Sequence, residues 1–272
     1  MLKNAMLDEL LRRLLAEGWA DSHLAIPEDA ASKRHLLRTL LNIRPPLTAR
    51  PELLALQDRF LLAERASVAV TDPHRLPAIG EAFGDGGIPF RDHLVLWKGD
   101  ITTLAADAIV NAANSKLLGC FVPHHRCIDN AIHSAAGIQL RLECHQLMQS
   151  QGFDEPAGQA KLTRGYNLPA RFVIHTVGPI IHGTVRPKDE SLLESCYMAC
   201  LDLAAQRHDI KVLAFCCIST GEFRFPKVPA AQIAVRTVCR WLQASGHHMH
   251  RVVFNVFTQQ DYDVYAALFR ET

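Results

Sequence analysis

The chain has 272 residues, of which 49% are hydrophobic and 21% are charged, and its formal net charge is +1. This composition is sufficient for a packed core, and it excludes a mainly disordered chain. The near-neutral charge argues against nucleic acid as a partner, but it leaves room for a pyrophosphate bound by backbone N–H groups.

No secretory signal and no run of about 18 uncharged apolar residues is found, so we expect neither export nor a membrane-spanning helix. The eight cysteines then indicate a reducing compartment, and we expect a cytoplasmic protein without a membrane partner. In such a compartment, clustered Cys and His residues indicate metal binding or chemistry more often than disulfides.

Residues 1–72 have the pattern of a helical extension. Leucines recur at helical spacing within residues 6–15 and 36–41, and a third helix is predicted to begin near Pro51. We interpret these helices as a cap packed on the main domain, with a surface for a partner protein as the alternative. The Pro- and Gly-rich residues 73–92 are predicted to form a connecting loop.

Residues 93–272 have the pattern of an α/β domain. Strands are predicted at residues 94–97, 108–110, 172–177, 212–218 and 252–257, and helical patterns cover residues 127–148, 191–205 and 230–244. Near-continuous apolar strands separated by helices are typical of a largely parallel sheet that is covered on both faces. Ligands of such sheets bind beyond the carboxyl ends of the strands, so the loops that follow the strands are the candidate site.

Polar loops follow three of the predicted strands. Asp100, after the first strand, can accept a hydrogen bond from an exocyclic amine such as that of adenine, or it can cap a helix. Asn111 and Asn114, after the second strand, leave room for a ligand near the backbone, although both are also common in turns. The fourth strand leads into a Ser/Thr/Gly loop, which favours binding of a diphosphate. That loop consists of Ser219, Thr220, Gly221, Glu222 and Phe223.

The order of these motifs resembles that of macrodomains: Gly-Asp-Ile-Thr, Asn-Ala-Ala-Asn, Val-Ile-His-Thr-Val-Gly-Pro and Ile-Ser-Thr-Gly. Residues 158–170 are also similar to the hydrolase-type branch of that family. The resemblance covers about residues 93–270. It implies a three-layer α/β/α fold with a mixed, largely parallel central sheet and ADP-ribose bound across the strand ends.

The resemblance also implies how ADP-ribose is bound. Asp100 and the backbone of Ile101 would contact the adenine, and the Ser219–Phe223 loop would hold the phosphates. Asn111 and Asn114 would belong to the ADP-ribose site, with Asn114 facing the distal ribose. Phe257 would stack near the adenine or, alternatively, belong to the core.

Residues 119–127 form a segment rich in cysteine and histidine, which we call the Cys–His loop. It replaces a glycine run that is common in hydrolase-type macrodomains, and its Cys-x4-His-x-Cys spacing is similar to the zinc-dependent branch. The resemblance implies Zn²⁺ held by Cys120, His125 and Cys127, which are residue types that zinc prefers. His124 is the alternative ligand, and two buried cysteines beside a surface histidine are the alternative without metal.

Together with the resemblance, these features predict a hydrolase that removes mono-ADP-ribose from proteins by cleaving the bond between C1″ of the distal ribose and an acceptor side chain. The resemblance implies that this bond is an ester to Asp or Glu. Zinc would polarise the sugar, activate a water or position hydroxyls. Asp129 would orient the water or act as general base, and Asn114 would fix the ribose hydroxyls. Asp129 could also cap the helix that follows it.

An ADP-ribose-binding reader module with a structural zinc is the alternative function. By resemblance to its branch, the protein partner would be a mono-ADP-ribosylated protein, such as a lipoyl-carrier protein modified by a sirtuin-type transferase.

Overall fold

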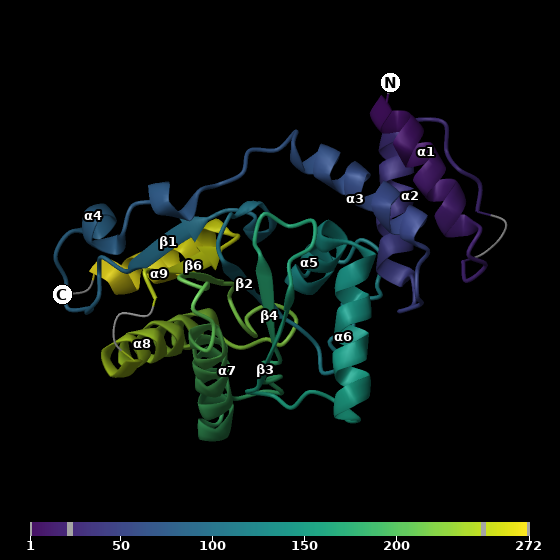
Figure 1. Cartoon of the computed structure of the whole chain (residues 1–272). Coiled ribbons are helices and arrows are strands. Elements are labelled where there is room, and N and C mark those ends of the chain that lie inside the picture. Colours follow the sequence, from purple (N-terminus) through teal and green to yellow (C-terminus); the bar gives the residue numbers. More distant parts are fainter. Residues whose placement is uncertain (1, 21–23, 246–248, 271–272) are drawn as a thin grey trace.

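The computed structural model describes residues 2–20, 24–245 and 249–270. Figure 1 shows a central sheet with helices around it and the N-terminal helices at one end. The helices are α1 (Leu2–Leu15), α2 (Ala30–Ile43), α3 (Pro51–Arg65), α4 (Ile79–Phe83), α5 (Ile128–Ala136), α6 (Ile138–Gln151), α7 (Pro187–Ala205), α8 (Lys227–Ser245) and α9 (Gln259–Arg270), with short 3-10 turns η1 (Pro73–Arg75) and η2 (Ile101–Thr103). The strands are β1 (Leu94–Lys98), β2 (Ala108–Ala112), β3 (Ala160–Arg164), β4 (Phe172–Thr176), β5 (Val212–Phe215) and β6 (Arg251–Val256).

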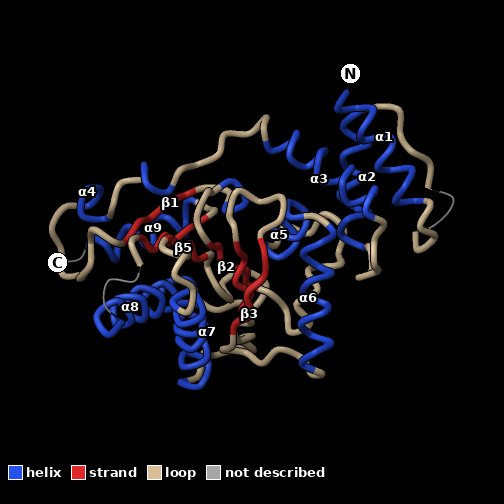
Figure 2. Tube along the Cα trace, in the orientation of Figure 1, coloured by secondary structure: helices blue, strands red, loops and turns tan. Residues whose placement is uncertain are grey.

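The six strands form one sheet in the order β1-β6-β5-β2-β4-β3. All neighbouring strands are parallel except β3, which is antiparallel to β4. Helices lie on both faces of this sheet (Figure 2). The predicted mixed, largely parallel α/β sheet and its five predicted strands are therefore confirmed, although β5 ends at Phe215 and residues 216–218 already belong to the following loop.

Two features of the main domain differ from the sequence prediction. Strand β3 lacks a continuous apolar run because it lies at the sheet edge, where one face stays partly exposed. The predicted helical pattern 127–148 is two helices, split at Gly137, whose φ is 94°. A Cβ at Gly137 would lie 2.5 Å from the side chain of Gln57, so both the turn and the close approach require glycine.

The three N-terminal helices have an apolar core of their own. It contains mainly leucines from α1 and α2 together with Phe60 of α3, and it also includes Ile138 of α6. Gln57 of α3 accepts a hydrogen bond from the backbone N–H of Ile138 at 2.8 Å, so the extension caps the start of α6. The helices predicted within residues 1–72 are thus present and pack on the main domain.

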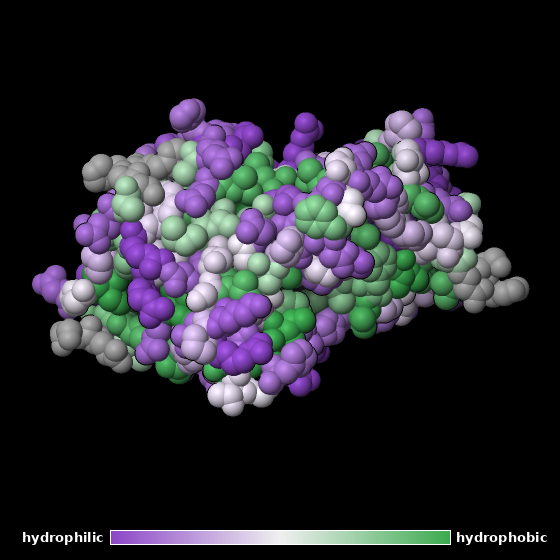
Figure 3. Space-filling view, turned by 90° about the horizontal axis from the view of Figure 1, so that it is seen from below, coloured by the Kyte–Doolittle hydropathy of each residue, from purple (hydrophilic) through white to green (hydrophobic). Residues whose placement is uncertain are grey.

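The segment between the extension and the first strand is less regular, as expected for a connection, although it contains η1 and α4. Seen from below, polar side chains cover much of the surface, with smaller apolar patches among them (Figure 3). None of the helices within the described residues is long and apolar enough to cross a membrane.

Candidate active site

The loops that follow the strands meet at one edge of the sheet, because the parallel strands all end there. The Cys–His loop leads from β2 into α5, and the Ser219–Phe223 loop leads from β5 towards α8. A contact between His125 Nε2 and Glu222 Oε1, 3.3 Å apart, joins these two loops. Residues that are about 100 positions apart in the chain therefore form one site.

Asp129 lies in the first turn of α5 and is buried. Its Oδ1 accepts a hydrogen bond from Asn111 Nδ2 at 2.8 Å, and its Oδ2 accepts one from Asn114 Nδ2 at 3.3 Å. Asn114 Nδ2 also donates to the carbonyl of Gly119, the residue before Cys120. The two asparagines of the Asn-Ala-Ala-Asn motif thus hold the carboxylate and the start of the Cys–His loop.

Asp129 does not cap its own helix, so that part of the sequence prediction is wrong. Cys127 occupies the capping position, and its Sγ accepts a hydrogen bond from the N–H of Asn130 at 3.4 Å. A cysteine is an unusual cap because sulfur is a weak acceptor. The carboxylate of Asp129 is consequently left for other partners, and the positive end of the helix dipole still lies near it.

The pKa of Asp129 is raised to about 6, mainly because burial disfavours the charged carboxylate. The hydrogen bond from Asn111 and the positive charge of Arg141 act in the opposite direction. A carboxyl group with this pKa is largely ionised at neutral pH and can still accept a proton readily, which is the property that a general base needs.

Behind Asp129 lies a buried group of His133, Cys144 and His175, whose ligand-type atoms lie within 4.8 Å of one another. Such a group could in principle hold a metal. Both nitrogens of His175 are already engaged, however, with Asn111 Nδ2 at 3.1 Å and Thr163 Oγ1 at 2.9 Å. Because Asn111 donates to Nδ1, Nε2 carries the proton, so His175 fixes the amide that holds Asp129.

His175 makes the stability of the fold dependent on pH. Burial lowers its pKa to about 3, whereas an unfolded histidine titrates near about 6.5. Between these values the unfolded chain binds a proton that the folded chain does not, so the free energy of unfolding falls as the pH falls. One such histidine changes the free energy of unfolding by up to about 1.4 kcal/mol per pH unit.

Urea unfolding of the wild type and of His175→Asn, measured from about pH 7.5 down to about pH 4.5, checks this expectation. The wild type should lose stability more steeply than the variant. His133, whose pKa burial also lowers, acts in the same direction, and Asp129, whose pKa is raised, acts in the opposite one. Both are present in each protein, so their effects largely cancel in the comparison, and equal slopes would contradict the assignment.

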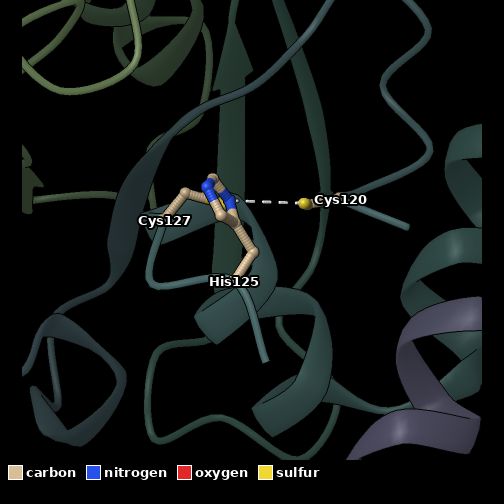
Figure 4. A group of neighbouring side chains, drawn as sticks. All are labelled: Cys120, His125 and Cys127. Carbon is tan, nitrogen blue, oxygen red and sulfur yellow. Dashed lines mark hydrogen bonds between the residues drawn. The ribbon is translucent and has the colours of Figure 1, made fainter. Parts of the chain in front are cut away.

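The Cys–His loop brings Cys120, His125 and Cys127 together (Figure 4). Their sulfur and nitrogen atoms lie within 4.8 Å of one another, with Cys120 Sγ 3.5 Å from His125 Nδ1. Two thiols and one imidazole are a donor set that suits zinc, and three protein ligands leave a fourth position open. All three side chains are partly exposed, so an ion held by them would be accessible from solvent.

The two adjacent histidines of this loop point to different places. His125 faces Cys120. The ring of His124 instead stacks on that of His35, with the ring centroids 3.5 Å apart, and its Nε2 lies 2.7 Å from Thr39 Oγ1. Of the two candidates, the structure therefore brings His125 into the cluster. Glu222 Oε1 lies 3.3 Å from Nε2, the outer nitrogen of His125, and a carboxylate at this position is a common way to orient a metal-binding histidine.

The Ser219–Phe223 loop has the properties of an anion site. Ser219 adopts a left-handed φ of 64°, and its buried hydroxyl has no partner among the described residues. The backbone N–H groups of Gly221, Glu222 and Phe223 likewise make no hydrogen bond to any residue that the structure describes. Gly178 lets the chain pass close by, since a Cβ there would lie 1.9 Å from Ser219 Oγ. Free N–H groups in succession suit a diphosphate.

The predicted adenine end is formed by Asp100, Ile101 and Phe257. The carboxylate of Asp100 caps η2 by accepting from the N–H of Thr102 at 2.9 Å, which confirms its capping role, and the side chain remains exposed. Ile101 is buried. Phe257 is 75% exposed just after β6, so the alternative that it belongs to the core is wrong.

The sequence prediction missed several residues that support the site. Arg141 of α6 is buried and donates to the carbonyl oxygens of Leu118 and Leu41, which fastens the Cys–His loop to the end of α2. A single arginine on an otherwise apolar helical face was the available signal. His175 belongs to the Val-Ile-His-Thr motif, but only the fold shows that it and His133 lie behind Asp129.

Comparisons with known proteins agree with this fold. The chain matches the Macro domain family over residues 110–234. A protein-ADP-ribose hydrolase from Treponema medium is 46% identical over 260 residues, covering 95% of this chain and 96% of that protein. Another from Staphylococcus aureus (strain MSSA476) is 45% identical, covering 97% of this chain and 95% of that protein.

A solved macrodomain from Trypanosoma brucei, in complex with ADP-ribose, has a TM-score of 0.64 and is 29% identical, covering 89% of this chain and 96% of that chain. The overall fold is thus shared with a protein that was solved in complex with ADP-ribose. The chain belongs to the Macro domain family.

Proposed function

We propose that this enzyme is a protein-ADP-ribose hydrolase that uses Zn²⁺ to cleave mono-ADP-ribose esters on Asp and Glu side chains. The observation that carries the proposal is the juxtaposition of two groups, one in the Cys–His loop and one in the first turn of α5. The buried carboxylate of Asp129 follows the Cys120–His125–Cys127 cluster by two residues, and Asn114 contacts both the carboxylate and the start of the loop. A protein that only binds ADP-ribose needs neither group.

In the proposed complex, ADP-ribose lies along the carboxyl edge of the sheet. Asp100 and the backbone of Ile101 meet the adenine, with Phe257 available to stack on it. The free N–H groups of the Ser219–Phe223 loop bind the diphosphate. Asn114 lies at the distal ribose, and Asn111 acts through Asp129, because it is fully buried and donates to that carboxylate.

The residues of the site suit the hydrolysis of an ester. Zinc bound to Cys120, His125 and Cys127 would supply a Lewis acid beside the distal ribose. Asp129 accepts a proton from the attacking water, which its pKa of about 6 permits. The acceptor carboxylate leaves without needing a proton, because its own pKa is about 4. One poised carboxyl group is therefore sufficient, whereas an alkoxide leaving group would also require an acid.

The proposed protein substrate is a mono-ADP-ribosylated protein in the reducing cytoplasm, where free thiols persist. A lipoyl-carrier protein modified by a sirtuin-type transferase is the partner that we propose on the resemblance to the zinc-dependent branch. All eight cysteines of the chain are unpaired, which is compatible with such a compartment.

Release of ADP-ribose from two substrates tests the proposal: a protein modified on Glu or Asp, and the same protein modified on Ser. We expect rapid release from the acidic acceptor and at least about 10²-fold slower release from serine, since the missing acid is worth about that factor. Failure to release from either substrate, with binding of free ADP-ribose retained, would replace the proposal with the reader function.

A further inference from the structure

One face of α2 carries four polar side chains that lie against the Cys–His loop and α5. His35, Arg38, Thr39 and Asn42 follow helical spacing, so they share one side of the helix. The opposite side carries the leucines of the N-terminal apolar core. Helices α2 and α5 are in contact, and Figure 1 shows the extension at that end of the domain. We call these four residues the α2 face.

The α2 face holds His124, the residue before His125. Asn42 Oδ1 accepts from the backbone N–H of His124 at 3.1 Å, and Thr39 Oγ1 lies 2.7 Å from its Nε2. The ring of His35 stacks on its ring at 3.5 Å with an interplanar angle of 8°. His124 has a φ of 57°, a left-handed conformation that is uncommon for residues other than glycine. The three contacts hold the residue in this conformation.

The α2 face also reaches the other side of the loop through Asn130. Arg38 Nη2 donates to Asn130 Oδ1 at 2.7 Å. Asn130 in turn donates from Nδ2 to the carbonyl of Val122 at 3.0 Å, and from its backbone N–H to Cys127 Sγ at 3.4 Å. Contacts from one helix, direct or through Asn130, therefore hold the backbone before His125, at Val122 and His124, and the sulfur of Cys127 after it.

We propose that the α2 face is a positioning surface for the metal site, which holds the Cys–His loop in its binding conformation before an ion arrives. The inference rests on the proposed metal site and gives the N-terminal extension a function beyond covering the domain. A loop that is ordered in advance loses less conformational freedom when it binds, so its affinity is higher. Mutation of residues that contact the metal ligands, but not the metal, commonly lowers metal affinity by about 10–100-fold.

The test uses the full-length chain and measures metal binding directly. Co²⁺ titration reports thiolate coordination by absorbance, and competition with a chromogenic chelator gives the zinc affinity. We expect the double variant His35→Ala, Thr39→Val to bind zinc about 10–100-fold more weakly than the wild type. Thr39→Ser retains the hydroxyl and should bind zinc as the wild type does.

Arg65→Ala is the matched control. Arg65 Nη1 donates to the carbonyl of Asn167 at 2.8 Å, so this variant also removes a contact between the extension and the main domain, but none to the loop. It should keep the zinc affinity of the wild type. Thermal unfolding of the metal-free proteins shows whether each variant is folded.

Weaker zinc binding in the double variant alone, with a metal-free unfolding midpoint like that of the control, supports the inference. Equal affinity in the double variant and the wild type overturns it and leaves the proposed function intact. An equal loss of affinity in Arg65→Ala also overturns it, because the effect would then be general destabilisation. A wild type without thiolate–cobalt absorption overturns both the inference and the zinc site of the proposed function.

Discussion

Asp129→Asn is expected to slow ADP-ribose release by about 10²–10⁴-fold, the range that a positioned general base contributes. Asparagine has nearly the same shape and cannot take a proton from water. It keeps an oxygen that can accept from Asn111, so the packing around the side chain is retained. Binding of free ADP-ribose should change little, because the adenine and phosphate contacts lie in other loops.

The measurement is single-turnover release from an acid-linked substrate, together with calorimetric binding of free ADP-ribose. Asp189→Asn is a matched control, because Asp189 is also a buried carboxylate in the first turn of a helix, but it pairs with Arg186 at the start of α7. This control should keep its activity. Wild-type release by Asp129→Asn would remove Asp129 from the mechanism.

Cys127→Ser is expected to weaken zinc binding by about 100-fold and to abolish release at limiting zinc. Structural zinc is held by about 10–16 kcal/mol, shared over four ligands, so each ligand contributes roughly 2.5–4 kcal/mol. Each 1.4 kcal/mol is about tenfold in affinity. A hydroxyl is a far poorer zinc ligand than a thiolate, and most of this contribution should therefore be lost.

Chelator competition and release assays at several zinc concentrations check this expectation. Partial recovery in excess zinc is expected, because mass action offsets a weaker affinity. Cys239→Ser is the control, since Cys239 is a buried thiol whose Sγ lies near the carbonyl of Pro89, away from the cluster. If Cys127→Ser binds zinc as tightly as the wild type, Cys127 is not a ligand.

The parts of the fold that were predictable from the sequence are those with local signals. Buried strands such as β2 and β5 are continuous apolar runs bounded by polar loops, and the spacing of Cys120, His125 and Cys127 is readable without a structure. Strand β3 was not predicted, because an edge strand has no such run. The break at Gly137 depends on Gln57 of a distant helix, which no local pattern contains.

The contacts behind the site were also beyond local reasoning. Thr39 and His124 are 85 positions apart, and Asn111 and His175 are 64 positions apart. Each pair meets only because the sheet order and the docking of the extension bring its elements together. For the same reason the sequence could not choose between His124 and His125, whereas the stacking of His124 on His35 separates them.

The most direct test of the central claim is release of ADP-ribose from a protein modified on Asp or Glu, before chelation, after chelation and after zinc is restored. The account predicts that release disappears when zinc is removed and returns when zinc is added back, while the metal-free protein still binds free ADP-ribose. Undiminished release by a protein shown to be free of metal would contradict it.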